Sequence, residues 1–337
     1  MNNFFNRENL RYAMIGSGSW ATALVKILMN GGREIAWYVR NHEKMDAMRA
    51  TRHNPYYLPS VKLDVERIHF SSDINEVIAN ADVLLFAIPS AYFLPQVSNI
   101  KESLDNKFIL SAIKGIVPGD NITVAEYFNR KYKIPFSRIG IVTGPCHAEE
   151  VAMERLSYLT LSSKYIETAR SLSDLFSCHY IKTVPGTDIY GVEFAAILKN
   201  IYAVAAGICH SLAYGDNFMS VLITNAYQEM KEFLHASHPD PKRCTSTSAY
   251  LGDLLVTTYS QFSRNRTFGS MIGKGYSVQS AQIEMNMVAE GYYSTKCVYE
   301  INRKYLVHMP IAEAIYKILY EEKYPAYIIK QLTEVLQ

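Results

Sequence analysis

Residues 12–21, YAMIGSGSWA, are a short apolar run and a glycine-rich turn that lead into a helical pattern. This is G-x-G-x-x-A between a strand-like run and a helix, the context that a dinucleotide-binding fingerprint requires. Gly16 permits the tight turn, and Gly18 lets the backbone approach a pyrophosphate at the positive N-terminus of the helix. Ala21 replaces the third glycine and still allows the helix to pack closely on the strand. The alternative is a plain glycine turn; the strand, the helix and the position near the start of the chain favour the fingerprint.

Working outward, the first half of the chain alternates apolar strand-like runs with helical patterns. Helices are expected between most of the strands, for example at residues 21–29, 73–79 and 123–132. This rhythm indicates βαβ units and a mainly parallel sheet. The predicted strands are residues 12–15, 34–39, 83–88, 108–112, 139–143, 158–162 and 180–184.

Beyond about residue 186 the pattern becomes helical, and no alternating strand run appears. The best loop candidate in this half is the polar stretch 237–248. We therefore predict an α/β fold, with a Rossmann-like dinucleotide-binding domain in residues 1–186 and an all-helical substrate and catalytic domain in residues 187–337. The predicted helices of the second half are residues 192–212, 221–234, 280–287, 294–304 and 311–321.

Composition and charge argue against several classes of protein. The 337 residues carry a formal net charge of +2, so no global field attracts the chain to nucleic acid or to anionic membranes. The five cysteines are scattered, as is typical of reduced thiols in a cytosolic protein. The polar N-terminus has no apolar signal core. We expect a cytoplasmic protein without a transmembrane segment.

Two further features could suggest a membrane span or a metal site. The most membrane-like stretch, residues 194–212, is interrupted by Lys199, Asn200 and His210, and we interpret it as a buried helix. Histidines such as His235 and His238 lack a third ligand nearby in the sequence, so no metal site is predicted.

The residue at the end of the second predicted strand helps to determine which cofactor is used, because an acidic residue there would bind the adenosine ribose of NAD. The chain has Tyr38-Val39-Arg40-Asn41 there instead. No carboxylate repels a 2′-phosphate, and Arg40 could pair with it; the alternative is that Arg40 is a solvated cation. We expect NADP to be used, with NAD also tolerated.

Three polar groups in the second half point to chemistry. Lys199 lies in an apolar, alanine-rich helix, where an ammonium is costly unless paired or partly neutralised, and such lysines often act as acid or base. Asp253 stands between apolar residues, and the cluster SRNRTFG at 263–269 has the guanidinium groups that suit a phosphate monoester. The alternatives are a lysine that extends to the surface, a helix N-cap and an exposed basic turn.

These segments together resemble the bacterial-type NAD(P)-dependent glycerol-3-phosphate dehydrogenases. The resemblance runs from Gly16 to about Tyr320, in the order found in that family. It is carried by GSGSWATAL at Gly16, NPYYLP at Asn54, IPS at Ile88, AIKGI at Ala112, GPCHAEEVA at Gly144, LKNIYAVAAGI at Leu198, GDN at Gly215, LITNAYQEM at Leu222, LGDLLVT at Leu251, SRNRTFG at Ser263, VAEGYYSTK at Val288 and MPIAEAIY at Met309.

The resemblance implies roles for individual positions. Lys199 matches the proton acceptor, Lys114 a lysine shared by cofactor and substrate, and Asp253 a substrate-binding residue. All three are expected to be catalytic: Lys114 adds positive charge beside the reacting oxygen, and Asp253 orients Lys199 or the substrate hydroxyls. The other implied cofactor contacts are Ser19, Trp20, Arg40, Ala148, Arg264, Val288 and Glu290. The other implied substrate contacts are Gly144, Cys146, Ser263, Arg264 and Asn265.

The chain also departs from the family pattern. Cys146 stands where threonine or serine is usual, His147 where phenylalanine is frequent, and Tyr250 where a small glycine is usual. Ser157-Tyr158 replaces a proline–threonine pair, and Ala195-Ala196 replaces a glycine pair. No charged catalytic group is lost, and Cys146 and Tyr250 are the departures that bear on the substrate contacts.

The implied activity is interconversion of sn-glycerol 3-phosphate and dihydroxyacetone phosphate, supplying glycerol 3-phosphate for phospholipid synthesis. A homodimer is compatible with these expectations. Two alternatives stay open: another two-domain dehydrogenase that acts on a hydroxyacyl thioester or a sugar acid, and a non-catalytic dinucleotide sensor. The SRNR cluster disfavours the first, and the intact Lys114, Lys199 and Asp253 disfavour the second.

Overall fold

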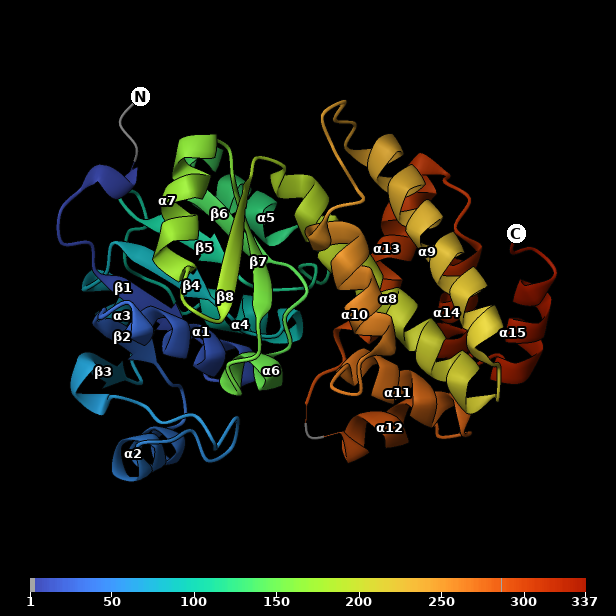
Figure 1. The fold of residues 1–337 in the computed structure, drawn as a ribbon, viewed down its shortest axis with the longest axis horizontal. Helices are drawn as coiled ribbons and strands as arrows, with labels where there is room; N and C mark the ends of the chain where they lie inside the picture. The colour runs from blue at the N-terminus through green and yellow to red at the C-terminus, as the bar shows by residue number, and fades with distance from the viewer. Residues whose placement is uncertain (1–3, 286) are drawn as a thin grey trace. The chain divides into compact units, whose positions relative to one another are not determined.

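The computed structural model describes residues 4–285 and 287–337. The chain divides into two compact units (Figure 1). Unit 1 comprises Met1–Ile113 and Val124–Ile189, and unit 2 comprises Lys114–Thr123 and Tyr190–Gln337. The short segment that carries Lys114 therefore belongs with the C-terminal unit, although it precedes the last strands of unit 1 in the sequence.

Unit 1 is built on an eight-stranded sheet with the order β3-β2-β1-β4-β5-β6-β7-β8. All neighbouring strands are parallel except β6 and β7, so the prediction of a mainly parallel sheet is confirmed. The strands are β1 Tyr12–Ile15, β2 Ile35–Tyr38, β3 Ile68–Ser71, β4 Val83–Phe86, β5 Phe108–Ser111, β6 Ile139–Thr143, β7 Ser157–Ser163 and β8 Ile181–Gly186. Seven of them lie where strands are predicted.

The edge strand β3 is absent from the sequence-based prediction. It is only four residues long, and its His69 is exposed, so it has too little apolar character to stand out. β3 pairs with β2 and aligns Ser71 with Tyr38.

The helices of unit 1 include α1, which is the helix predicted after the glycine-rich turn. They are α1 Ser19–Asn30, α2 His42–Thr51, α3 Ile74–Ala79, α4 Phe93–Val97, α5 Val124–Tyr132, α6 Ala148–Ala152 and α7 Ile166–Phe176. Short 3₁₀ turns occur at Phe4–Asn6, Val65–Arg67, Ser90–Tyr92 and Phe136–Arg138.

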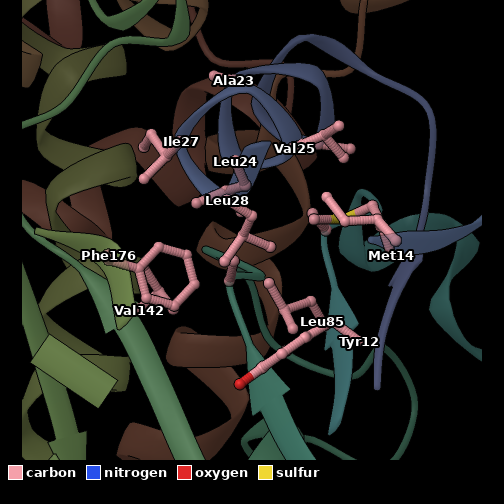
Figure 2. Close-up of a cluster of buried hydrophobic side chains, with 14 of the residues drawn as sticks. Tyr12, Met14, Ala23, Leu24, Val25, Ile27, Leu28, Leu85, Val142 and Phe176 are labelled. Carbon is pink, nitrogen blue, oxygen red and sulfur yellow. The ribbon is translucent and has the colours of Figure 1, made fainter. Parts of the chain in front are cut away.

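The core of unit 1 forms where α1 packs on the sheet. Leu24 and Leu28 of α1 are fully buried in the same cluster as Leu85 of β4 (Figure 2). Val142 of β6 and Phe176 of α7 complete this part of the cluster. Each fully buried leucine contributes about 1.5–3 kcal/mol, so this contact fixes α1, and with it the glycine-rich turn, on the sheet.

Unit 2 is helical in its described part, apart from one isolated bridge between Val117 and Ile122. Its helices are α8 Ile189–Ser211, α9 Asp216–Ser237, α10 Asp253–Tyr259, α11 Arg264–Gly273, α12 Val278–Glu284, α13 Glu290–Tyr305, α14 Pro310–Tyr320 and α15 Pro325–Thr333, with a π-helical turn at Ser248–Gly252. The five predicted helices correspond to α8, α9, α12, α13 and α14. Within the predicted range 280–287, Asn286 lies outside the described residues, and α12 ends at Glu284. The predicted loop 237–248 connects α9 to the π-helical turn.

α8 is long and apolar enough to cross a membrane by length and composition alone. Its most apolar window is completely buried within the protein, which confirms the interpretation as a buried helix. A side chain in the middle of α8 is therefore held in a dry environment, and Lys199 is in that position.

α8 and α11 approach each other through glycines. A Cβ atom on Gly207 would overlap the carbonyl oxygen of Arg266, and one on Gly269 would overlap that of Val204. Ser270 Oγ also donates a hydrogen bond of 3.3 Å to Gly207 O. This close backbone contact fixes the position of the first turn of α11 relative to α8.

Candidate active site

The glycine-rich turn has the geometry that a dinucleotide needs. Gly16 has φ +122°, and a Cβ there would overlap Ala87 O, so only glycine is accommodated. Trp37 Nε1 on β2 donates a 2.6 Å hydrogen bond to Gly16 O and holds the turn. A Cβ on Gly18 would meet nothing within 4 Å, so open space lies beside the backbone where a pyrophosphate would approach.

The centre of unit 2 contains a buried lysine–aspartate pair. Lys199 of α8 and Asp253 of α10 are both buried, and Lys199 Nζ donates to Asp253 Oδ1 at 2.5 Å. Asp253 is the first residue of α10, but Gly252 is the N-cap, so the alternative that Asp253 caps the helix is wrong. The alternative that Lys199 extends to the surface is also wrong.

Lys114 adds a second positive charge to this pair. Its Nζ lies 3.9 Å from Asp253 Oδ2, and its side chain is 19% exposed. Asp253 Oδ2 is buried and accepts no hydrogen bond within residues 4–285 and 287–337. A buried carboxylate oxygen without a donor is costly, so this atom is a suitable acceptor for a hydroxyl group of a ligand.

The environment of Lys199 lowers the pKa of its ammonium from its ordinary value of 10.5 to about 7. Burial is the main cause because it disfavours the charged form, and the charge of Lys114 acts in the same direction. The Asp253 carboxylate opposes this shift. A lysine with a pKa near neutrality can both accept and donate a proton under physiological conditions.

A chain of amide hydrogen bonds begins at the backbone of Lys114 and includes Asn200, the neighbour of Lys199 in the sequence. Asn200 Nδ2 donates to Lys114 O at 2.7 Å, and Asn265 Nδ2 donates to Asn200 Oδ1 at 2.8 Å. Asn265 Oδ1 accepts from Gly291 N at 2.8 Å. The chain ties the Lys114 segment, α8, α11 and α13 together. Asn200 is missing from the sequence-based prediction, and its only signal is an amide next to Lys199 in an apolar helix.

The SRNR cluster forms the start of α11. Ser263 is the N-cap, and its Oγ accepts from Arg266 N at 3.3 Å. Ser263 and Asn265 are buried and Arg264 is half-buried, so the alternative of an exposed basic turn is wrong. The structure therefore places Arg264 and Asn265 in the first turn of the helix that packs against α8, with Ser263 as its N-cap.

The other predicted site residues of unit 2 lie on either side of the N-cap of α13. Val288 is half-buried before the helix, and Glu290 is its first residue. The unusual Tyr250 is buried in the π-helical turn that precedes Asp253. Such turns are rare and frequently found at functional sites.

The predicted site residues of unit 1 lie in the turns and helices that follow strands β1, β2 and β6. Ser19 is buried at the start of α1, Trp20 is half-buried beside it, and Arg40 is exposed after β2. Gly144 follows β6 with φ +115°, and Cys146 Sγ donates to Tyr158 O at 3.2 Å. Ala148 is the buried first residue of α6.

In the described part of the chain, no group of three or more His, Cys, Asp or Glu side chains could hold a metal ion. The polar groups around Lys199 are instead the ammonium of Lys114, the carboxylate of Asp253 and the amides of Asn200 and Asn265.

The fold and the site define a class of protein, the dinucleotide-dependent dehydrogenases with a sheet-based unit and a helical unit. Two family descriptions match the sequence: NAD-dependent glycerol-3-phosphate dehydrogenase N-terminus over residues 11–169, and the corresponding C-terminus over residues 188–330. The chain belongs to the NAD-dependent glycerol-3-phosphate dehydrogenase family.

Individual relatives agree with this assignment. The chain is 35% identical over 316 residues to the glycerol-3-phosphate dehydrogenase [NAD(P)+] of Streptococcus uberis, covering 93% of each chain. It is 36% identical to that of Streptococcus agalactiae, covering 92% of each. The crystal structure of glycerol-3-phosphate dehydrogenase from Coxiella burnetii superposes with a TM-score of 0.88 and 26% identity, covering 96% of this chain and 99% of that one.

Proposed function

We propose that this protein interconverts sn-glycerol 3-phosphate and dihydroxyacetone phosphate, with NADP or NAD as the hydride carrier. The observation that carries the proposal is the buried Lys199, which forms an ion pair with Asp253. The other carboxylate oxygen of Asp253 lies 3.9 Å from the ammonium of Lys114. Lys199 combines a pKa near neutrality with a rigid position, which proton transfer to a carbonyl oxygen requires. A dinucleotide sensor without catalysis would have no need of this arrangement.

The two parts of the chain divide the work in this proposal. Residues 1–186 bind the dinucleotide at the glycine-rich turn, and residues 187–337 bind the substrate and carry Lys199. Lys114 lies within residues 1–186 of the sequence, but its segment belongs to unit 2. Its carbonyl oxygen accepts a hydrogen bond from Asn200.

The chemistry of the residues follows from their charges. The nicotinamide ring, when bound, supplies or accepts the hydride at C2 of the substrate. Lys199 takes the proton of the C2 hydroxyl during oxidation and returns it during reduction. Lys114 stabilises negative charge on that oxygen, and Asp253 orients Lys199 and accepts from a substrate hydroxyl through Oδ2.

The phosphate of the substrate is assigned to the start of α11. Arg264 and Asn265 bind the phosphate, with Ser263 at the cap, and this remote binding positions C2. Asn265 already uses its carbonyl oxygen on Gly291 N, so one N–H of its amide is left for the substrate. Gly144 and Cys146 are further proposed substrate contacts.

The proposed cofactor contacts come from both halves of the chain. Arg40 is proposed to pair with the 2′-phosphate of NADP, because its guanidinium makes no hydrogen bond or ion pair with any described residue. The remaining proposed contacts are Gly16, Gly18, Ser19, Trp20, Lys114, Ala148, Arg264, Val288 and Glu290. We propose a preference for NADP, and Arg40→Asp should weaken binding of NADPH much more than binding of NADH.

The cellular setting is also part of the proposal. We infer a cytoplasmic enzyme that supplies glycerol 3-phosphate for phospholipid synthesis, and a homodimer is compatible with it. The charge of +2 gives no reason to expect nucleic acid as a partner.

One assay tests the proposed function. Purified protein is mixed with dihydroxyacetone phosphate and either NADPH or NADH, and cofactor oxidation is followed by absorbance. We expect turnover with both cofactors. With NADP+ or NAD+ and a hydroxyacyl thioester or a sugar acid as substrate, we expect no reduction of the cofactor. Folded protein that oxidises neither cofactor would contradict the proposal.

A further inference from the structure

The segment between α2 and β3 is anchored to the glycine-rich turn. Asn54 is almost fully buried, and its Nδ2 donates to Ser17 O at 3.0 Å and to Thr22 Oγ1 at 2.8 Å. Thr22 Oγ1 in turn donates to Gly18 O at 3.0 Å. The residues that follow Asn54 are therefore held beside the turn where the dinucleotide binds.

Arg40 and the first turn of α2 lie at the same edge of the sheet. β1 and β2 are parallel, with Ile15 aligned with Tyr38, so the glycine-rich turn and the segment after β2 leave the sheet side by side. Asn41 caps α2 by accepting from Lys44 N at 2.8 Å, which makes Lys44 the third residue of the helix. In dinucleotide-binding folds this edge binds the adenosine ribose and its 2′ substituent.

The ammonium of Lys44 is held there by two tyrosines. Lys44 Nζ lies 4.8 Å from the ring centroid of Tyr56 and 5.2 Å from that of Tyr57. Both tyrosines follow the anchored Asn54 after a single intervening residue, Pro55. In the described part of the chain no carboxylate pairs with Lys44, and the lysine is half-buried. Ring faces attract an ammonium without using its N–H donors, so these donors are available to a ligand.

We propose that Lys44, held by Tyr56 and Tyr57, is a second cation that binds the 2′-phosphate of NADP and, together with Arg40, determines cofactor preference. The inference rests on the proposed use of a nicotinamide dinucleotide, and it assigns the specificity to a residue outside the fingerprint. A lysine that is already ordered loses less side-chain entropy when it binds a phosphate than a mobile one. The acidic neighbours Glu43 and Asp46 are exposed on α2, and Asp46 lies 4.0 Å from Arg49.

The test compares cofactors that differ only in the 2′-phosphate. Calorimetry gives the dissociation constants of NADPH and NADH, and of the fragments 2′,5′-ADP and 5′-AMP, for the wild type and for Lys44→Met. We expect Lys44→Met to weaken the binding of NADPH and 2′,5′-ADP about tenfold, which is the effect of losing one charge-assisted hydrogen bond to phosphate. The dissociation constants of NADH and 5′-AMP should change less than about twofold. The effect of the substitution on NADPH binding should become smaller at high salt.

Two further variants control for charge and folding. Lys44→Arg keeps a cation and should retain most of the preference for NADPH. Lys62→Met removes an exposed lysine from the same segment and should not change the affinity for either cofactor. Bound NADH shows that each variant is folded.

The outcomes separate this inference from the proposed function. If Lys44→Met loses the same affinity for NADPH and NADH, or loses none for either, Lys44 does not have the proposed role. If the wild type reduces dihydroxyacetone phosphate but Lys44→Met keeps its preference for NADPH, the inference about Lys44 is contradicted and the proposed function is not. A folded wild type that binds neither cofactor contradicts both.

Discussion

Lys199 Nζ lies 2.5 Å from Asp253 Oδ1, although the two residues are 54 positions apart and on different helices. Without this carboxylate the interior of unit 2 would hold an unpaired ammonium, which is strongly unfavourable. With it, the pKa of Lys199 still falls to about 7, because burial and Lys114 outweigh the attraction of Asp253. The balance of these three influences makes Lys199 suitable for reversible proton transfer.

The first prediction concerns the pH dependence of the two reaction directions. Reduction needs the ammonium form of Lys199, so its kcat should fall as pH rises above about 7. Oxidation needs the neutral amine, so its kcat should rise with pH up to about 7 and then level off. Steady-state rates across the pH range check this. Profiles that run in the same sense for both directions would exclude Lys199 as the titrating group.

The second prediction concerns the charges around Lys199. Removing Lys114 as Lys114→Met takes away a like charge, so the pKa of Lys199 should rise and the pH profile should move to higher pH. Asp253→Asn takes away the opposite charge, so the profile should move to lower pH. The shifts are measured from residual activity, with thermal unfolding as the control for folding. Shifts of the same sign in both variants would contradict the described electrostatics.

The third prediction concerns the phosphate of the substrate. Arg264→Ala should raise the KM for dihydroxyacetone phosphate, because a charge-assisted pair worth about 1.5–3 kcal/mol is lost. Arg264→Lys keeps the charge and should have a smaller effect. The dissociation constant of the cofactor is measured in parallel, since Arg264 is also a proposed cofactor contact. An unchanged KM in Arg264→Ala would place this residue outside the substrate site.

The fourth prediction concerns Glu229, a buried carboxyl group of α9. It accepts from Ile311 N at 2.5 Å and from Ala312 N at 3.3 Å, at the start of α14. Burial raises its pKa from the ordinary value of 4.5 to about 8, although these hydrogen bonds oppose the shift. The folded state thus binds the proton more tightly than the unfolded state, and the stability that this proton contributes is lost as pH rises from about 4.5 to about 8.

Unfolding by denaturant at several pH values tests this role of Glu229. Glu229→Gln should remove a slope of up to about 1.4 kcal/mol per pH unit over that range. Glu232→Gln changes an exposed carboxylate of the same helix and is the matched control. Identical pH dependence in the wild type and in Glu229→Gln would show that Glu229 is ionised when folded.

Much of unit 1 could be predicted from sequence because its signals are local. The turn at Gly16 and Gly18, the apolar strands and α1 each follow from residues adjacent in the chain. Strand β3 escaped prediction because an exposed His69 interrupts four residues at the sheet edge. The helix α11 escaped because it starts inside a polar cluster that also suits a turn.

The active-site lysine could be predicted, but its surroundings could not. Lys199 stands out as a single charge in an apolar helix. The hydrogen bond from Asn265 to Asn200 joins residues 65 positions apart, and no local pattern indicates it. It depends on the glycine contacts between α8 and α11, which become visible only when the two helices are packed.

The most direct test of the account is the turnover of Lys199→Met with dihydroxyacetone phosphate. Methionine keeps the length and apolar packing of the side chain but cannot carry the proton. Turnover should fall by roughly a hundredfold or more, the usual effect of removing a general acid or base, while cofactor binding and thermal stability stay close to wild type. A folded Lys199→Met protein that binds cofactor and reduces dihydroxyacetone phosphate at a near-normal rate would contradict the account.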